Sequence, residues 1–104
     1  MRKESFDYKV LELVKKIPEG RVATYGGIAG ALDTKAYRAV GQALKRNKNP
    51  VRVPCHRVIC SDGKIGGYCG KGIKNVRMKY SLLMKEGIEI EQGRVDLKKF
   101  IHRF

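Results

Sequence analysis

Residues 24–45 read TYGGIAGALDTKAYRAVGQALK, and this stretch decides the fold that we expect. Thr24 can cap a helix of small residues over about 25–32, because a threonine hydroxyl accepts a hydrogen bond from the first helical turn. A break follows at 33–34, and the apolar spacing predicts a second helix over about 35–45. Two short helices joined by a tight turn, the second of them carrying basic residues, indicate a helix-turn-helix.

Apolar residues at helical spacing predict a further helix on each side of this motif. The first has Ser5 as its N-cap and ends at Pro18, and the second runs over about 75–86 and ends at Gly87. Short extended segments or turns are expected at 21–23, 51–59 and 61–64. The expected inner face of the first flanking helix consists of Phe6, Val10, Leu13, Val14 and Ile17, and that of the second consists of Val76, Tyr80, Leu82 and Leu83. The expected inner face of the 35–45 helix consists of Ala36, Ala39, Val40, Ala43 and Leu44. The tail over 88–104 follows no pattern that assigns it an element.

Positive charge gathers in the middle of the chain. The 104 residues include 23 Lys and Arg against 10 Asp and Glu, a net charge of +13, and residues 34–85 hold thirteen basic residues and one acid, Asp62. Such a surface favours a polyanion, because binding phosphates releases condensed counterions. Membrane-surface binding is a weaker alternative, since the basic residues do not lie on one long amphipathic helix. A merely solubilising surface would not require the near-exclusion of acids from so long a stretch.

The charge and the helix pattern together predict one domain over 1–104. We expect a mainly α, winged-helix-like helix-turn-helix DNA-binding domain, with short extended segments around Cys55. No apolar run is long enough to cross a membrane, and the charged N-terminus is unlike a signal peptide. We therefore expect no membrane partner and a cytoplasmic location, or a nuclear one in a eukaryote.

The stretch Pro54-Cys55-His56-Arg57-Val58 places a thiol at a stiff position beside an imidazole. A base in reach can draw the thiol of Cys55 toward thiolate, the form that attacks electrophiles. Because neighbouring residues of a strand point to opposite faces, the chain must turn here, or a water must bridge Cys55 and His56. The alternative is a core cysteine beside a surface histidine.

The sequence argues against a metal site and against a phosphate-binding loop. Cys55, His56, Cys60 and Cys69 contain no C-x2-C pair, so we expect no metal site, and three irregularly spaced cysteines suit a reducing compartment better than a disulfide framework. The glycine-rich stretch 65–72 lacks the strand-loop-helix context and the Lys-Ser/Thr of a phosphate-binding loop. We expect no cofactor.

Several motifs in order resemble the C-terminal DNA-binding and catalytic domain of the O6-alkylguanine-DNA alkyltransferases, the methylated-DNA–protein-cysteine methyltransferases. The resemblance runs from about Ser5 to Gly87, and the family's N-terminal domain is expected to be absent. The matching stretches are Thr24-Tyr25-Gly26-Gly27-Ile28-Ala29, Ala36-Tyr37-Arg38-Ala39-Val40-Gly41, Pro54-Cys55-His56-Arg57-Val58, Ile65-Gly66-Gly67-Tyr68 and Leu82-Leu83-Met84-Lys85-Glu86-Gly87.

The resemblance implies a role for each catalytic position. Cys55 would accept the alkyl group, His56 would activate the thiol through a water, and Glu86 would orient that histidine. Tyr68 would support the leaving guanine, and Asn47 would brace the active-site turns. The acceptor becomes a thioether, so one chain would act once.

The resemblance also implies positions for DNA and for the base. Tyr25 would help to rotate the target nucleotide out of the helix, and Arg38 would fill its place in the stack. Further DNA contacts are expected at Thr24, Ala36, Ala39 and Arg57, and the substrate pocket at Val58, Cys69 and Gly70. The partner would be double-stranded DNA carrying O6-alkylguanine, bound by a monomer.

Two other functions remain open from the sequence. Alkyltransferase-like proteins bind lesions without chemistry, but they lack the reactive cysteine and typically carry tryptophan in its place. A helix-turn-helix regulator would need no Cys-His pair and would usually need a dimer interface. The presence of Cys55 favours transfer.

Overall fold

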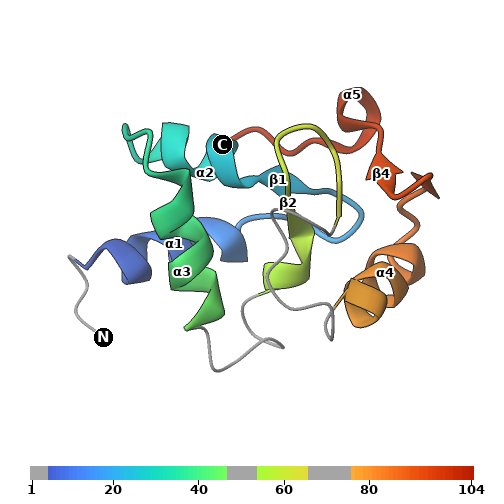
Figure 1. The fold of residues 1–104 in the computed structure, drawn as a ribbon, viewed down its shortest axis with the longest axis horizontal. Coiled ribbons are helices and arrows are strands. Elements are labelled where there is room, and N and C mark those ends of the chain that lie inside the picture. Colours follow the sequence, from blue (N-terminus) through green and yellow to red (C-terminus); the bar gives the residue numbers. More distant parts are fainter. Residues whose placement is uncertain (1–4, 47–53, 66–75) are drawn as a thin grey trace.

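The computed structural model describes residues 5–46, 54–65 and 76–104, and these residues are mainly helical, as predicted (Figure 1). The described elements are, in order, α1 (Phe6–Lys15), β1 (Ala23–Thr24), α2 (Tyr25–Ala31), α3 (Tyr37–Lys45), the 3-10 turn η1 (Cys55–Arg57), β2 (Val58–Ile59), α4 (Val76–Lys85), β3 (Ile90–Glu91), β4 (Arg94–Val95) and α5 (Leu97–Phe100). Within those ranges, no helix is long and apolar enough to span a membrane.

Side-chain caps begin the first two helices, as the sequence predicts. The Ser5 hydroxyl accepts a hydrogen bond from the Tyr8 backbone N–H at 3.1 Å, and Thr24 Oγ1 accepts one from Gly27 N–H at 2.9 Å. The third helix starts two residues later than predicted, because the Thr34 hydroxyl accepts from Ala36 N–H at 3.2 Å and holds a turn ahead of the helix.

The helix-turn-helix packs on α1 around one apolar core. Its buried members come from α1 and the turn after it, from β1, α2 and α3, and from β2. They are Val10, Val14, Ile17, Ala23, Ile28, Ala29, Val40, Ala43, Leu44 and Val58. The prediction of an inward-facing Ala36 is wrong, since that residue precedes α3 and is exposed. An ion pair from Arg46 to Asp7, 2.5 Å between Nε and Oδ2, joins the end of α3 to the start of α1.

The extended segment around the cysteine is shorter than predicted. The chain turns at η1, and only β2 continues as a strand, while residues 51–53 lie outside the described part. β2 pairs in parallel with β1, so that Ala23 is opposite Val58 and Thr24 is opposite Ile59. This pairing brings the start of α2 beside the segment that follows Cys55.

The unassigned tail builds a second core. β3 and β4 form an antiparallel hairpin whose turn residues, Gln92 and Gly93, have φ of 51° and 76°, the left-handed values of a two-residue type I′ turn. The core consists of Val22, Ile59, Ile65, Leu83, Ile88, Val95 and Phe100. The turn at 61–64 fits against this hairpin because Gly63 has φ +90°, and a Cβ there would lie 2.7 Å from the Val95 carbonyl oxygen. Of the residues expected to pack α4, Leu83 is buried and Leu82 is exposed.

Candidate active site

The 3-10 turn places Cys55 and His56 on a bend of the chain instead of on a strand. Arg57 N–H donates to the Pro54 carbonyl oxygen at 3.0 Å and closes the turn. Cys55 is partly buried and packs against the first core. Of the two alternatives, a turn or a bridging water, the structure shows a turn at this position, so the strict alternation of a strand does not separate the two side chains.

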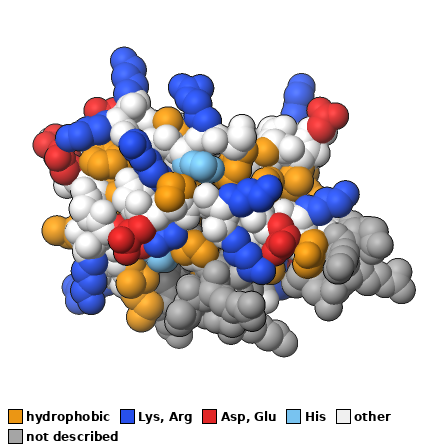
Figure 2. All heavy atoms as spheres, turned by 180° about the vertical axis from the view of Figure 1, so that it is seen from behind, with side chains coloured by type: hydrophobic (Ala, Val, Ile, Leu, Met, Phe, Trp, Pro, Cys, Tyr) orange, Lys and Arg blue, Asp and Glu red, His pale blue; other side chains and the backbone are white. Residues whose placement is uncertain are grey.

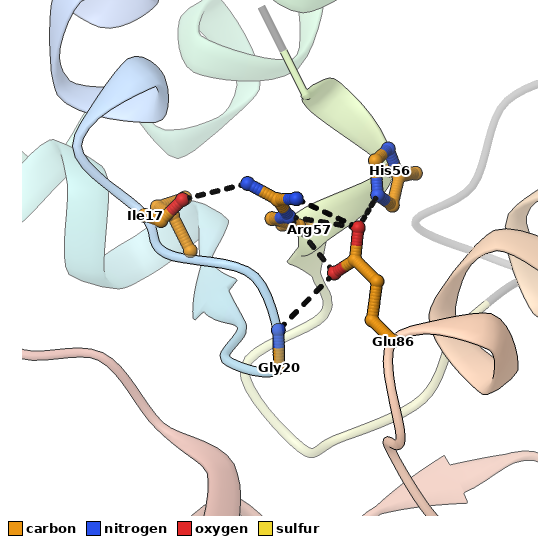
Figure 3. A network of polar contacts seen from close by, with 5 residues as sticks. All are labelled: Ile17, Gly20, His56, Arg57 and Glu86. Carbon is orange, nitrogen blue, oxygen red and sulfur yellow. Dashed lines mark hydrogen bonds and ion pairs between the residues drawn. The ribbon is translucent and has the colours of Figure 1, made fainter.

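Glu86 joins His56 to the rest of the molecule (Figure 3). Its Oε2 lies 2.8 Å from His56 Nε2 and accepts from Arg57 Nη2 at 2.7 Å. Its Oε1 accepts from Arg57 Nε at 2.9 Å and from the Gly20 backbone N–H at 3.3 Å. The side chains of His56, Arg57 and Glu86 are only 14%, 16% and 9% exposed, so these contacts are shielded from water.

The position of Glu86 is unfavourable for helix stability. It follows the last residue of α4, where the helix dipole is negative and disfavours a carboxylate. The forked guanidinium of Arg57 offsets this cost by pairing with both oxygens. An acid at this end of a helix is thus held by specific partners.

These partners keep Glu86 ionised. Burial acts to raise the pKa of the Glu86 carboxyl, but hydrogen bonds from Arg57, His56 and Gly20 outweigh it and hold the pKa below its usual value. An ionised carboxylate can only accept hydrogen bonds, so His56 Nε2 carries the hydrogen that faces it. In the neutral imidazole, Nδ1 is then the nitrogen that can accept a proton.

Arg57, expected to contact DNA, lies in this network. Besides its bonds to Glu86, its Nη1 donates to the Ile17 carbonyl oxygen at 2.9 Å. Ile17 and Gly20 flank the turn that follows α1 (Figure 3). The guanidinium therefore joins the cysteine turn, the end of α4 and the loop after α1.

The other residues expected to contact DNA lie near the start of the two helix-turn-helix helices. Arg38 is exposed in the first turn of α3, Ala39 beside it is half-buried, and Tyr25 is the half-buried first residue of α2. Thr24 is 8% exposed because its hydroxyl caps α2. Val58, which is expected to line the substrate pocket, is buried in β2. Four expected site residues lie outside the described part of the chain: Asn47, Tyr68, Cys69 and Gly70.

Sequence reasoning missed one neighbour of Tyr25. Lys79 Nζ lies 5.8 Å from the centre of the Tyr25 ring, a cation–π distance. Lys79 is seven residues before Glu86, which directly follows α4, so helical periodicity predicts that both lie on the same side of the helix. That spacing was the available signal. Among the described residues, no group of His, Cys, Asp and Glu could hold a metal ion.

Known proteins are similar to this chain in sequence. The family model described as "6-O-methylguanine DNA methyltransferase, DNA binding domain" matches residues 5–88. A bifunctional methyltransferase/endonuclease from Picrophilus torridus is 49% identical over 85% of this chain and 28% of its own length. A methylated-DNA–protein-cysteine methyltransferase from Archaeoglobus fulgidus is 47% identical over 85% of this chain and 60% of its own length. The chain thus spans about a quarter to three-fifths of these relatives.

Solved structures agree in fold. The complex of S. pombe Atl1 with damaged DNA containing O6-carboxymethylguanine matches with a TM-score of 0.86 and 34% identity over the whole of both chains. Mycobacterium tuberculosis OGT in complex with DNA matches with a TM-score of 0.69 and 40% identity, over 82% of this chain and 51% of that one. This chain therefore belongs to the family of 6-O-methylguanine DNA methyltransferase DNA-binding domains.

Proposed function

We propose that this chain repairs DNA by moving an alkyl group from O6 of guanine to the sulfur of Cys55, once per molecule. The proposal depends on the shielded contact of 2.8 Å between Glu86 Oε2 and His56 Nε2. His56 directly follows the partly buried Cys55 in the sequence. A structural core cysteine needs no such oriented base. Family membership supports the same reaction.

The proposed reaction balances with two proton transfers and one substitution. His56 takes the thiol proton at Nδ1 through a water, because Glu86 occupies Nε2. The thiolate attacks the alkyl carbon, a carbon–sulfur bond forms, and the carbon–oxygen bond breaks with its electron pair remaining on the base. A proton donor neutralises the leaving base, and Tyr68 is our candidate for it. The product thioether ends the activity of that chain.

Arg57 acts in this proposal as a positioning residue. It occupies both oxygens of Glu86 and the Ile17 carbonyl, so it fixes the carboxylate against His56. This role replaces the direct DNA contact expected from the sequence. A guanidinium that is 16% exposed and paired within the protein has little capacity left for phosphate.

Double-stranded DNA is the proposed partner of a monomer. The net charge of +13, the exposed Arg38 and the half-buried Tyr25 support binding with the target nucleotide turned out of the stack. The solved neighbours in complex with DNA, which in the Atl1 complex is damaged, support DNA as the partner. Such a substrate would place the protein in the cytoplasm of a prokaryote or the nucleus of a eukaryote.

Intact-mass analysis tests the transfer. The protein is mixed with a duplex carrying one O6-methylguanine, and the expected result is a gain equal to one methyl group replacing one hydrogen, with peptide mapping placing it on Cys55. Cys55→Ser should gain no mass and should still bind the duplex. A methyl group found on Cys60 or Cys69 would overturn the assignment.

A second candidate is lesion binding without transfer. It is favoured by the match to Atl1 over the whole chain, since the family model stops at residue 88. The same mass experiment separates the two functions. Tight binding of the lesion duplex by the unmodified protein, without any gain of mass, would select this second function.

A further inference from the structure

The ring of Tyr25 approaches two helices besides its own. Tyr25 is the first residue of α2, and its half-buried side chain packs against the first core. A Cβ built on Gly41 of α3 would lie 3.9 Å from Tyr25 Cε1, so this edge of the ring lies beside α3 backbone that carries no side chain. From α4, Lys79 Nζ lies over the ring at 5.8 Å from its centre. The first core, α3 and α4 therefore all support the ring.

Lys79 is suited to hold the ring in one place. The residue is half-buried, so part of its side chain is shielded from water. A cation over the face of an aromatic ring is attracted by the ring's quadrupole, and the attraction grows as water is excluded. At a partly exposed site this attraction corresponds to a factor of about two to five in an equilibrium constant. Lys79 therefore favours one placement of the Tyr25 ring over the other rotamers that a tyrosine can adopt.

Positive charge by itself does not distinguish Lys79. The chain carries 23 Lys and Arg, and Figure 2 shows such side chains spread across the described surface of one face, with Asp and Glu among them. One charge among so many adds a small, general attraction to DNA. Lys79 differs from the exposed Lys85 of the same helix in its contact with the ring that is expected to turn the nucleotide.

The helix that carries Lys79 also leads to the candidate base. Glu86 directly follows α4 and lies 2.8 Å from His56, and Lys79 is seven residues earlier. One helix thus contacts both the residue proposed to rotate the nucleotide and the residue proposed to take up the thiol proton. The packing of α4 places the supports of Tyr25 and of His56 together.

We propose that Lys79 is a positioning residue, which holds the Tyr25 ring in the orientation from which it turns the target nucleotide out of the duplex. This inference rests on the proposed function, because it takes Tyr25 to act on that nucleotide. A ring that is already held loses less conformational freedom when DNA binds, so a larger fraction of the bound duplex has its nucleotide turned out. Lys79 acts through the ring and not on the reacting atoms.

A double-mutant cycle tests whether Lys79 acts through Tyr25. Lys79→Met removes the charge but keeps a long, flexible side chain, Lys79→Arg retains the charge, and Lys85→Met is the control with the same loss of charge. Tyr25→Leu removes the ring. Each change is made in Cys55→Ser, which leaves the lesion intact. The saturating duplex carries 2-aminopurine beside O6-methylguanine, and the fluorescence of 2-aminopurine rises when the neighbouring base leaves the stack.

The expected effect depends on the presence of the ring. Lys79→Met should lower the ratio of rotated to stacked nucleotide by about two- to fivefold, Lys79→Arg should restore most of it, and Lys85→Met should change it little. In Tyr25→Leu, the further change Lys79→Met should have no effect, because the contact is already lost. In the protein without DNA, the NMR signals of the Tyr25 ring, assigned with Tyr25→Phe, should shift in Lys79→Met and stay in place in Lys85→Met.

Three outcomes would overturn the inference. The first is unchanged rotation in Lys79→Met, and the second is an equal loss of rotation with and without the Tyr25 ring. The third is a slope of log affinity against log salt that falls by about 1 while the Tyr25 signals stay in place, which would make Lys79 a phosphate contact.

Failure of the proposed function looks different from these outcomes. The protein with Cys55 intact would then gain no mass from the lesion duplex, whereas nucleotide rotation and the Tyr25 signals would still report the effect of Lys79. Urea unfolding verifies that each variant is folded, and Lys79→Gln replaces Lys79→Met if the latter protein is not.

Discussion

At the scale of single residues, the candidate site is held together by the carboxylate of Glu86, which forms more hydrogen bonds than an exposed acid on the surface usually does. Glu86 is held by Arg57, by His56 and by the backbone of Gly20, although its place at the end of α4 disfavours negative charge. A buried ion pair is usually explained by a gain in folding stability. Such a pair is weak evidence for that gain, because the cost of removing both charges from water can exceed their attraction. The orientation of His56 that we propose would account for all of these contacts.

Replacing Glu86 by Gln should separate these two effects. The amide keeps the shape but places an NH2 group where one carboxylate oxygen accepts, so hydrogen bonds to a charged group are lost at a cost of about 2 kcal/mol in the free energy of unfolding. The alkylation rate should fall by tenfold or more, because the imidazole loses its orientation. Urea unfolding and single-turnover kinetics measure the two effects.

The matched control for that substitution is Glu89→Gln. Glu89 is exposed and contacts Lys99 at 3.0 Å, so neither stability nor rate should change appreciably. A Glu86→Gln protein with an unaltered alkylation rate would remove Glu86 from the catalytic site and leave it a structural role.

The lowered pKa of Glu86 also predicts a dependence of stability on pH. Its pKa is lower in the folded protein than the ordinary value of 4.5 expected for the unfolded chain. As the pH falls toward and below 4.5, the unfolded state therefore binds more protons than the folded state. The stabilisation by Glu86 is therefore present above that value and is lost as the pH falls through the folded pKa. Urea titrations between pH 7 and 3 should show a smaller acid loss for Glu86→Gln. An identical acid loss in both proteins would contradict the network.

At the scale of elements, caps position the functional residues. Thr24 begins α2 one residue before Tyr25, and the turn held by Thr34 delays α3 so that Arg38 falls in its first turn. Both helices are short, and α2 is rich in glycine, which costs about 1 kcal/mol per residue relative to alanine. The caps therefore matter more here than in a long helix.

Thr24→Ala should remove the first of these caps. The free energy of unfolding should fall by about 1 kcal/mol, since Gly27 N–H loses its acceptor. Thr24→Ser retains the hydroxyl and should recover most of that loss. Thermal or urea unfolding of the three proteins gives the comparison, and equal losses in Ala and Ser would assign the effect to the buried methyl group.

Arg38→Ala tests how α3 meets DNA. If Arg38 fills the place of the turned-out nucleotide, repair in duplex should slow several-fold more than reaction with free O6-benzylguanine, because only the duplex must lose stacking and pairing. Lys45→Ala removes an equal charge from the last turn of the same helix and should slow both reactions little. Equal slowing of both substrates by Arg38→Ala would refute the finger role.

The sequence predicts elements better than it predicts their ends and contacts. The caps at Ser5 and Thr24 were readable because capping is local chemistry. The bond of Arg57 to the Ile17 carbonyl was not, because residues forty positions apart meet only through packing. The hairpin around Gln92 and Gly93 escaped prediction, since its strands are two residues long and show no alternation.

At the scale of the whole molecule, the tail stabilises the strand before the helix-turn-helix. Val22 N–H donates to the Phe100 carbonyl oxygen at 2.9 Å, and His102 N–H donates to the Val22 carbonyl oxygen at 2.7 Å. Arg21 Nη1 adds a bond to the Lys99 carbonyl oxygen at 2.6 Å. The second core thus ties the last residues of the chain to the entry of α2.

Phe100 should carry much of that stabilisation. It is 8% exposed within the second core, so Phe100→Ala should lower the free energy of unfolding by about 3 kcal/mol. Phe104→Ala, four residues later and 44% exposed, should lower it by less than about 1 kcal/mol. Urea unfolding compares the two, and losses of equal size would mean that the tail does not pack as described.

The paired strands β1 and β2 form a partition between the two cores. Ala23 and Val58 enter the first core, and their neighbours Val22 and Ile59 enter the second. Glu86 reaches His56 from α4, a helix that contributes Leu83 to the second core. If Cys55 and His56 act as proposed, a fluctuation that separates α4 from β1 and β2 would leave Cys55 without an oriented base.

Amide hydrogen exchange can detect such openings. The Gly20 amide is bonded only to the carboxylate of Glu86 among the described groups, so its protection should report how often α4 detaches. In Glu86→Gln that amide should exchange faster, while the Val22 amide, bonded to the Phe100 carbonyl oxygen, should keep its protection. The protection of one glycine amide would then report the fraction of molecules in which Glu86 is in place to orient His56 as proposed.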